Sequence, residues 1–167
     1  IVDAARQLDQ RQVDLLIDTH LHSGQAISHH VLYQDRVQMY CRAGHPALDG
    51  PQDETTLAEY EFALLLPEGQ RYPTLHRPLQ EEMVERRCGF STFNLMTQAA
   101  MIAGSDMLGL TTERLFAMVS RLWPLQTLDF PSLGEEQIDV ALHFNKLSGK
   151  EPLLKEIIET VIRSFKA

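Results

Sequence analysis

The sequence predicts an α/β fold with a largely parallel sheet and helices on both faces of that sheet. Short apolar runs of strand length alternate with helical patterns along most of the 167 residues. Hydrophobic residues make up 44% of the chain, which is enough for a substantial core in one domain or two small lobes. No internal repeat and no low-complexity stretch interrupts the pattern.

The first part of the chain predicts one helix followed by strands. Val2, Ala5 and Leu8 recur at helical spacing, and an apolar run of strand length follows them. Gly44, His45 and Pro46 end the first group of β-like runs, which are rich in Val and Tyr. The strands expected in this part cover residues 13–17, 27–33, 36–41 and 62–66.

The second part of the chain predicts four helices and three strands. Thr74 is a suitable N-cap for the first of these helices, Gly89 ends it, and Gly104 ends the next one. The last helix is amphipathic, with its apolar residues on one side. The expected helices cover residues 74–87, 93–103, 113–119 and 151–165. The expected strands cover residues 107–110, 125–128 and 138–144.

Composition and charge exclude several functional classes. With 23 acidic and 15 basic residues the net charge is −8, so we expect this chain not to bind nucleic acid by itself. No apolar run approaches the 18 or so residues that cross a bilayer, and no signal-peptide pattern is visible, so the expected location is cytoplasmic. Cys41 and Cys88 lie far apart and fit two ordinary thiols in a reducing cytosol.

The order of several short motifs resembles the effector-binding domain of bacterial LysR-type transcriptional regulators. Residues 12–17 (QVDLLI) are similar to a strand of that family, and residues 31–33 and 37–41 are similar to its paired strands that close on a His-Pro, here His45-Pro46. Residues 103–110 (AGSDMLGL) are similar to a later turn and strand of the family.

Two residues depart from the family's turn and strand motif. Asp106 stands where a second Gly is common, and Thr111 stands where Pro is common, although a Ser-Asp pair at this turn occurs in one branch of the family. Residues 140–144 (VALHF), followed by Pro152 and the terminal helix, are similar to the last strand and helix of that branch. The resemblance covers nearly the whole chain.

The resemblance implies two Rossmann-like lobes joined by two crossing strands, a periplasmic-binding-protein-like fold of type 2, with a small-molecule effector in the cleft between the lobes. Lobe I would comprise residues 1–42 plus 140–167, and lobe II residues 43–139. The strand, helix and strand that open the family's first lobe, and its N-terminal winged helix-turn-helix, are not in this sequence. We therefore expect an incomplete first lobe, and DNA binding only through that absent domain. A substrate-binding module of a transporter or of a related two-lobed enzyme is the alternative, because one fold hosts many functions.

One loop is the best candidate for an effector site. Arg71 precedes the expected helix N-terminus at Thr74, and a cation beside exposed backbone N–H groups favours an anionic ligand group. The resemblance places Tyr72, Pro73, Thr74 and Leu75 in the family's cleft. An exposed loop with an N-cap threonine is the other interpretation.

Further candidates follow the ends of predicted strands. Asp18 and Thr19 come directly after one strand, where ligands gather in open α/β sheets, although a solvated loop explains them equally well. Phe144 and Asn145, and residues 92–94, are weaker candidates that fit packing and capping roles as well.

Neither metal binding nor catalysis is expected. His20 and His22, and the adjacent His29 and His30, lack diagnostic spacing, and no cysteine or carboxylate cluster completes a ligand set. No nucleophile elbow, glycine-rich phosphate loop or zinc-binding helix motif occurs, so we expect no cofactor and no enzyme activity. The partners expected are a small-molecule effector and a second copy of the chain.

Overall fold

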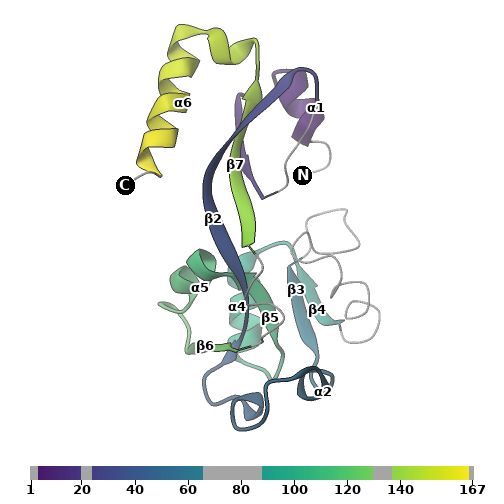
Figure 1. Cartoon of the computed structure of the whole chain (residues 1–167). Coiled ribbons are helices and arrows are strands. Elements are labelled where there is room, and N and C mark those ends of the chain that lie inside the picture. The colour runs from purple at the N-terminus through teal and green to yellow at the C-terminus, as the bar shows by residue number, and fades with distance from the viewer. Residues whose placement is uncertain (1–3, 20–23, 66–87, 130–136, 166–167) are drawn as a thin grey trace. The chain divides into compact units, whose positions relative to one another are not determined.

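The computed structural model describes residues 4–19, 24–65, 88–129 and 137–165, and these residues form an α/β structure (Figure 1). The chain divides into two compact units. Unit 1 comprises Ile1–Asp35 and Ile138–Ala167, and unit 2 comprises Arg36–Gln137. The lobes predicted from the sequence place these boundaries at 42 and 140, a few residues further along the chain.

Unit 1 contains two strands of a five-stranded sheet and the first part of a third. Its elements are α1 (Ala4–Asp9), β1 (Leu15–Asp18), the first part of β2 (Ile27–Arg42), β7 (Gln137–Asn145), the 3-10 helix η2 (Ser148–Lys150) and α6 (Pro152–Ser164). β1 pairs antiparallel with β7, Leu15 lying opposite Phe144, and β7 lies next to β2.

The core of unit 1 forms where α6 packs on the sheet. Leu154 and Ile158 stand four residues apart on α6 and therefore share one face of the helix. Both are buried against Leu32 of β2 and Leu142 of β7. Pro152 at the first position of α6 suits the helix start, because its fixed φ is helical and its missing N–H has no partner to lose there.

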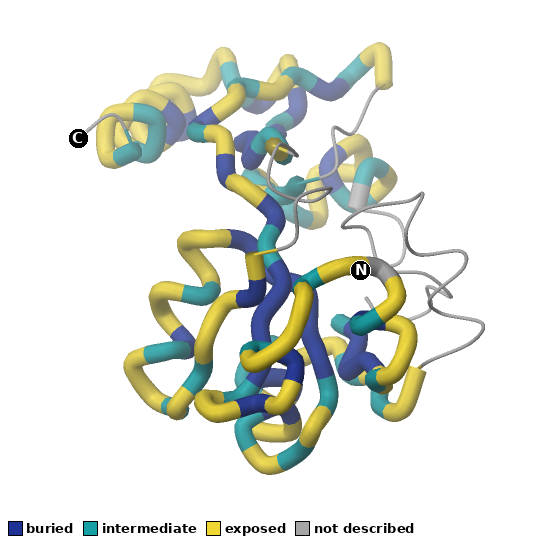
Figure 2. Tube along the Cα trace, turned by 60° about the horizontal axis from the view of Figure 1, so that its bottom comes forward, coloured by how far each residue is buried: buried dark blue, intermediate teal, exposed yellow. Residues whose placement is uncertain are grey.

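Unit 2 combines three antiparallel strands with a separate parallel pair. β2 is flanked by β5 (Gly109–Thr112) and β6 (Leu125–Leu128), both antiparallel, and β3 (Phe62–Leu65) pairs parallel with β4 (Cys88–Thr92). Buried residues are concentrated on β2, β3 and β5 (Figure 2). The remaining elements are η1 (Pro46–Leu48), α2 (Glu54–Leu57), α4 (Leu95–Ala103) and α5 (Glu113–Val119).

The His45-Pro46 turn after β2 is held by the imidazole of His45, which is fully buried. Its Nδ1 accepts a hydrogen bond from the Ala47 backbone N–H at 3.0 Å. Its Nε2 lies 3.1 Å from the carbonyl oxygen of Asp106, so a neutral imidazole with the proton on Nε2 satisfies both contacts. The Tyr60 ring packs edge-on against it at 4.6 Å between centroids. This histidine is therefore a structural residue of the turn.

Two sequence-based expectations about the strands are wrong. The two strands expected over 27–33 and 36–41 are one continuous strand, β2. A largely parallel sheet is also wrong for the part of the chain that the structure describes, where β1–β7, β2–β5 and β2–β6 are antiparallel and β3–β4 is parallel. An apolar run identifies a buried strand, but it carries no information about the direction of its neighbours.

Candidate functional site

The loop that contains the strongest sequence-based candidates lies outside the described residues. This holds for Arg71, Tyr72, Pro73, Thr74 and Leu75, and for the helix expected over 74–87. Their role in binding an effector stays a prediction from the sequence.

Asp18 and Thr19 lie at the end of β1 in unit 1, as expected, and both are half-buried. The carboxylate Oδ1 of Asp18 accepts a hydrogen bond from the backbone N–H of Thr19 at 2.7 Å. In the register of the sheet, Asp18 lies opposite Ala141 of β7. The carboxylate therefore contacts the backbone at the end of the strand, and its part in ligand binding stays a prediction.

Phe144 and Asn145 belong to the packing of unit 1. The ring of Phe144 packs against the core cluster around Leu142, and a Cβ added at Gly149 would come within 2.9 Å of it. Asn145 is buried, and its amide lies 3.4 Å from the carbonyl oxygen of Leu8 at the end of α1. These contacts give both residues a structural role in the fold.

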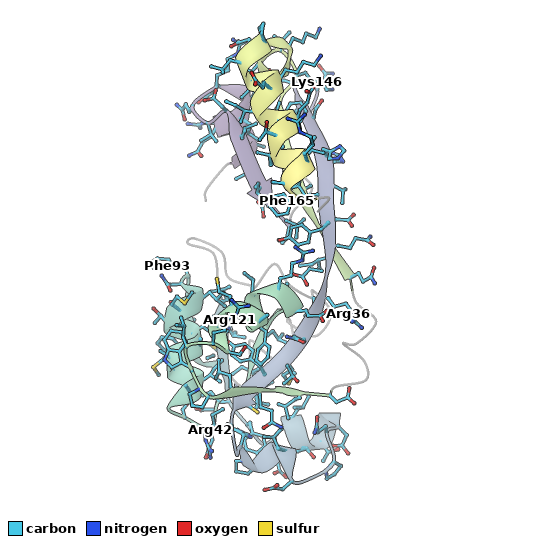
Figure 3. The ribbon with its side chains drawn as sticks, turned by 90° about the vertical axis from the view of Figure 1, so that its left-hand side faces the viewer. Arg36, Arg42, Phe93, Arg121, Lys146 and Phe165 are labelled. Atoms are coloured by element: carbon cyan, nitrogen blue, oxygen red, sulfur yellow. The ribbon has the colours of Figure 1, made fainter. Side chains whose placement is uncertain are left out.

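Residues 92–94 cap helix α4 in unit 2. The Asn94 side chain accepts hydrogen bonds from the backbone N–H groups of Met96 and Thr97, at 2.9 and 3.1 Å. The Thr92 hydroxyl accepts another from the backbone N–H of Asn94 at 3.1 Å. Phe93 between them is 74% exposed and is labelled in Figure 3. The capping interpretation accounts for Asn94 and Thr92, whereas the exposed ring has no packing role in the part of unit 2 that the structure describes.

A cavity of about 400 Å³ lies within unit 2. Its walls come from β2, the start of α5, the segment around η1, and the end of β6. The lining residues are Arg36, Val37, Gln38, Met39, Leu48, Gln52, Glu113, Gln126, Thr127, Leu128 and Asp129. None of them is a candidate from the sequence, because they come from four segments that are brought together only by the fold.

The cavity is lined by polar groups around an apolar patch. Arg36 of β2, labelled in Figure 3, forms an ion pair of 3.5 Å with Glu113 of α5, and both side chains are more than half exposed. The amide oxygen of Gln52 accepts a hydrogen bond from the backbone N–H of Asp129. The Nε2 of Gln38 is buried, and none of the described residues forms a hydrogen bond with it. Amide and hydroxyl groups of this kind can bind a small polar molecule.

The described residues contain no cluster suited to a metal ion. No group of three or more His, Cys, Asp or Glu side chains gathers within residues 4–19, 24–65, 88–129 and 137–165. His29 and His143 have ring centroids 5.7 Å apart in unit 1, but no carboxylate or thiol of that part of the chain completes a ligand set with them. His20 and His22 lie outside the described residues.

Both thiols are held in their neutral form. Burial raises the pKa of Cys41 from 9.0 to about 11. Partial burial also raises the pKa of Cys88, and the Glu61 carboxylate adds to that shift. A nucleophilic cysteine needs a lowered pKa, so neither environment favours thiolate chemistry.

Within the described part of the chain, no helix is long and apolar enough to span a membrane.

Comparison with known proteins identifies a family over almost the full chain. The model of the LysR substrate binding domain matches residues 2–166. An HTH-type transcriptional regulator of Escherichia coli (strain K12), YbeF, is 41% identical over 165 residues, which are 99% of this chain and 52% of that protein. This chain therefore spans about half the length of that relative.

Solved structures share the fold at low sequence identity. The probable transcriptional regulator PA0477 from Pseudomonas aeruginosa matches with a TM-score of 0.81 at 14% identity, over 95% of this chain and 52% of that chain. The regulatory domain of CcmR from Synechocystis PCC6803, solved in complex with 2-PG, matches with a TM-score of 0.72 at 13% identity, over 97% of this chain and 78% of that chain. Two compact units linked through β2 and β7 agree with these matches, which carry the type 2 periplasmic-binding-protein-like fold expected from the sequence. The chain belongs to the LysR substrate-binding domain family of transcriptional regulators.

Proposed function

We propose that this chain is the ligand-sensing region of a LysR-type transcription factor of the cytoplasm. It binds a small-molecule effector and thereby changes the DNA affinity of a helix-turn-helix domain carried elsewhere in the longer protein. The observation that carries the proposal is the family match over residues 2–166, together with a relative that is an HTH-type regulator and of which the chain spans about half.

The connection between the two units supports a sensing role. β2 passes from unit 1 into unit 2 between Asp35 and Arg36, and the chain returns between Gln137 and Ile138 at the start of β7. Two units linked by two strands are a common arrangement for hinge motions that respond to a ligand. The regulatory domain of CcmR, which has the same fold, was solved in complex with 2-PG, and this supports effector binding here.

The charge of the chain supports a separation of effector binding and DNA binding into different parts of the longer protein. A net charge of −8 opposes contact with phosphate backbones, so DNA recognition belongs to another part of that protein. The family is one of regulators and not of enzymes, which favours this function over a transport or enzyme module. The effector contacts are predicted from the sequence at Arg71 to Leu75, Asp18, Thr19 and Phe144.

The test is a DNA-binding measurement on the full-length protein. Fluorescence anisotropy with a labelled fragment of its own promoter region should give saturable, sequence-specific binding, and one compound from a panel of polar metabolites should change the Kd. This chain alone, at the same salt concentration, should give no specific binding. Specific promoter binding by the isolated chain, or a full-length sequence without a helix-turn-helix, would contradict the proposal.

A further inference from the structure

We propose that His45 is an acid-sensitive switch in unit 2, in which protonation of the imidazole breaks the contacts that hold the turn after β2. The proposal is independent of the proposed function, because it involves none of the predicted effector contacts. It rests on the two hydrogen bonds of the ring, on its complete burial and on the charged groups around it.

His45 is an unusual N-cap residue for the 3-10 helix η1. The preferred N-cap residues accept a hydrogen bond through a side-chain oxygen, which remains an acceptor near neutral pH. At the start of η1 the acceptor is instead the Nδ1 of an imidazole, which accepts the hydrogen bond of the Ala47 backbone N–H at 3.0 Å. This cap therefore exists only while Nδ1 carries no proton.

The second ring nitrogen already carries the proton of the neutral imidazole. Nε2 lies 3.1 Å from the backbone carbonyl oxygen of Asp106, which can only accept a hydrogen bond. A second proton must therefore bind to Nδ1, where it would point at the N–H of Ala47. Two donors would then face each other, and a buried donor without an acceptor is strongly unfavourable.

The surroundings of the ring do not compensate a positive charge. His45 is 0% exposed, and a buried charge without a partner is costly. The Asp106 carboxylate is already bound by Arg42, whose Nε and Nη2 lie 2.9 and 2.7 Å from its Oδ1. The same guanidinium donates to the carbonyl oxygens of Ala43 and Gly44, which places a like charge beside the turn.

The other titratable groups of the neighbouring segments do not supply a counter-charge either. The Tyr60 ring packs edge-on against the imidazole and is uncharged near neutral pH. Asp49 at the far end of η1 is exposed, and the Glu61 carboxylate lies against Gly89 of β4. Protonation therefore displaces the ring towards solvent, and both of its hydrogen bonds are lost.

The turn that opens lies where three segments of unit 2 meet. The Ala43 N–H donates to the carbonyl oxygen of Pro124, directly before β6, at 2.7 Å. Asp106 precedes β5, which pairs with β2 up to Gly109 opposite Tyr40. A solvated histidine gains its proton near about pH 6.5. Because the open turn binds this proton and the closed turn does not, the closed form is favoured above that pH and is lost as the pH falls.

The test is amide hydrogen exchange of the purified protein, followed by NMR from about pH 7.5 down to about pH 5 and corrected for the intrinsic pH dependence of exchange. We expect the protection of the Ala47 amide to fall at least about fivefold over this range. His45→Asn keeps a capping oxygen that does not titrate, so the protection should become independent of pH. His29→Gln, at an exposed histidine of β2, is the matched control and should respond like the unmodified protein.

Two results would overturn the proposal: unchanged Ala47 protection in the unmodified protein, or a pH response that persists in His45→Asn. If His45→Asn fails to fold, as judged by circular dichroism, the ring ¹⁵N signals of His45 in the unmodified protein decide the question. Protonation of Nδ1 at the pH at which Ala47 loses protection supports the switch. A ring that stays neutral over the whole range, or that gains its proton while Ala47 stays protected, rejects it.

Discussion

The hydroxyl of Tyr40 donates a hydrogen bond of 3.0 Å to the side-chain oxygen of Gln98, and both residues are fully buried in unit 2. The amide nitrogen of Gln98 in turn donates to the carbonyl oxygen of Ala63 at 2.7 Å. This chain of two bonds ties the central strand β2 to helix α4 and strand β3. Burial raises the pKa of the Tyr40 hydroxyl far above its ordinary value, so the hydroxyl keeps its proton and remains the donor.

Removing this hydroxyl should destabilise the protein. Tyr40→Phe leaves the Gln98 oxygen buried without a donor, at a cost of about 1–3 kcal/mol in the free energy of unfolding. Tyr60→Phe is the matched control, because the Tyr60 hydroxyl has no hydrogen bond within the described residues and should change stability by less than about 0.5 kcal/mol. Urea denaturation of the three proteins measures the difference, and equal midpoints for the two variants would show that the network contributes nothing.

Gly109 is required because β5 passes close to side chains of the core. A Cβ at this position would lie 2.3 Å from Cδ1 of Ile102 and 2.8 Å from Cε1 of Tyr40. We expect Gly109→Ala to cost about 1–3 kcal/mol through overpacking. Gly50→Ala, where a Cβ meets nothing within 4 Å, is the control and should be close to neutral. Thermal unfolding checks both variants. An unchanged stability of Gly109→Ala would mean that the side chains of Ile102 and Tyr40 move aside to accept the added Cβ.

The buried thiol of Cys41 predicts a loss of stability at alkaline pH. Below pH 9 the thiol is neutral in the folded and the unfolded chain, so its burial contributes fully to stability. Between pH 9 and about 11 the unfolded chain ionises while the folded chain does not, and stability therefore falls. Cys41→Ala should flatten this part of the profile by on the order of 1–2 kcal/mol. Denaturant melts at several pH values measure it, with Cys88→Ala as a comparison that should keep most of the slope.

The sequence predicts those helices and strands whose own residues show a clear apolar pattern. The helix expected over 113–119 and the strand over 125–128 match α5 and β6, because their apolar patterns are bounded by clear breaks. The break expected between 33 and 36 is absent, since polar side chains there are satisfied across the sheet. Gln34 donates to Asp139 at 3.0 Å, and Arg36 pairs with Glu113.

Strand β4 and the cavity of unit 2 could not be predicted from the sequence, because both depend on contacts between distant segments. Strand β4 (Cys88–Thr92) has few apolar residues and is mostly exposed, so it shows no strand pattern of its own and depends on pairing with β3. The cavity of unit 2 is lined by residues that are ordinary one by one. They come from four segments that only the fold brings together, which no local pattern predicts.

Self-association is expected from the apolar surface of α6. Leu153 is 72% exposed and Ile157 41% exposed, and the two are neighbours on one face of the helix because they stand four residues apart. The combined variant Leu153→Glu with Ile157→Glu should shift sedimentation towards the monomer. Lys155→Glu, an exposed residue on another face of the same helix, should leave the assembly unchanged. A strict monomer of the unmodified protein at high micromolar concentration would contradict the prediction.

The last prediction concerns the effector contacts expected from the sequence. With the effector of the full-length protein identified, Arg71→Ala should remove a cation that pairs with its anionic group, and Thr74→Val should remove the hydroxyl while keeping the shape. Each should weaken binding several-fold or more, because an unpaired polar group of the ligand costs roughly 1–3 kcal/mol. Loss of a helix N-cap alone costs on the order of 1 kcal/mol of stability, so affinity and not melting temperature is the decisive measurement. Gln38→Met is the control, since it lies in the cavity of unit 2 and should leave the affinity for this effector unchanged. Unchanged affinity in both Arg71→Ala and Thr74→Val would place the effector elsewhere.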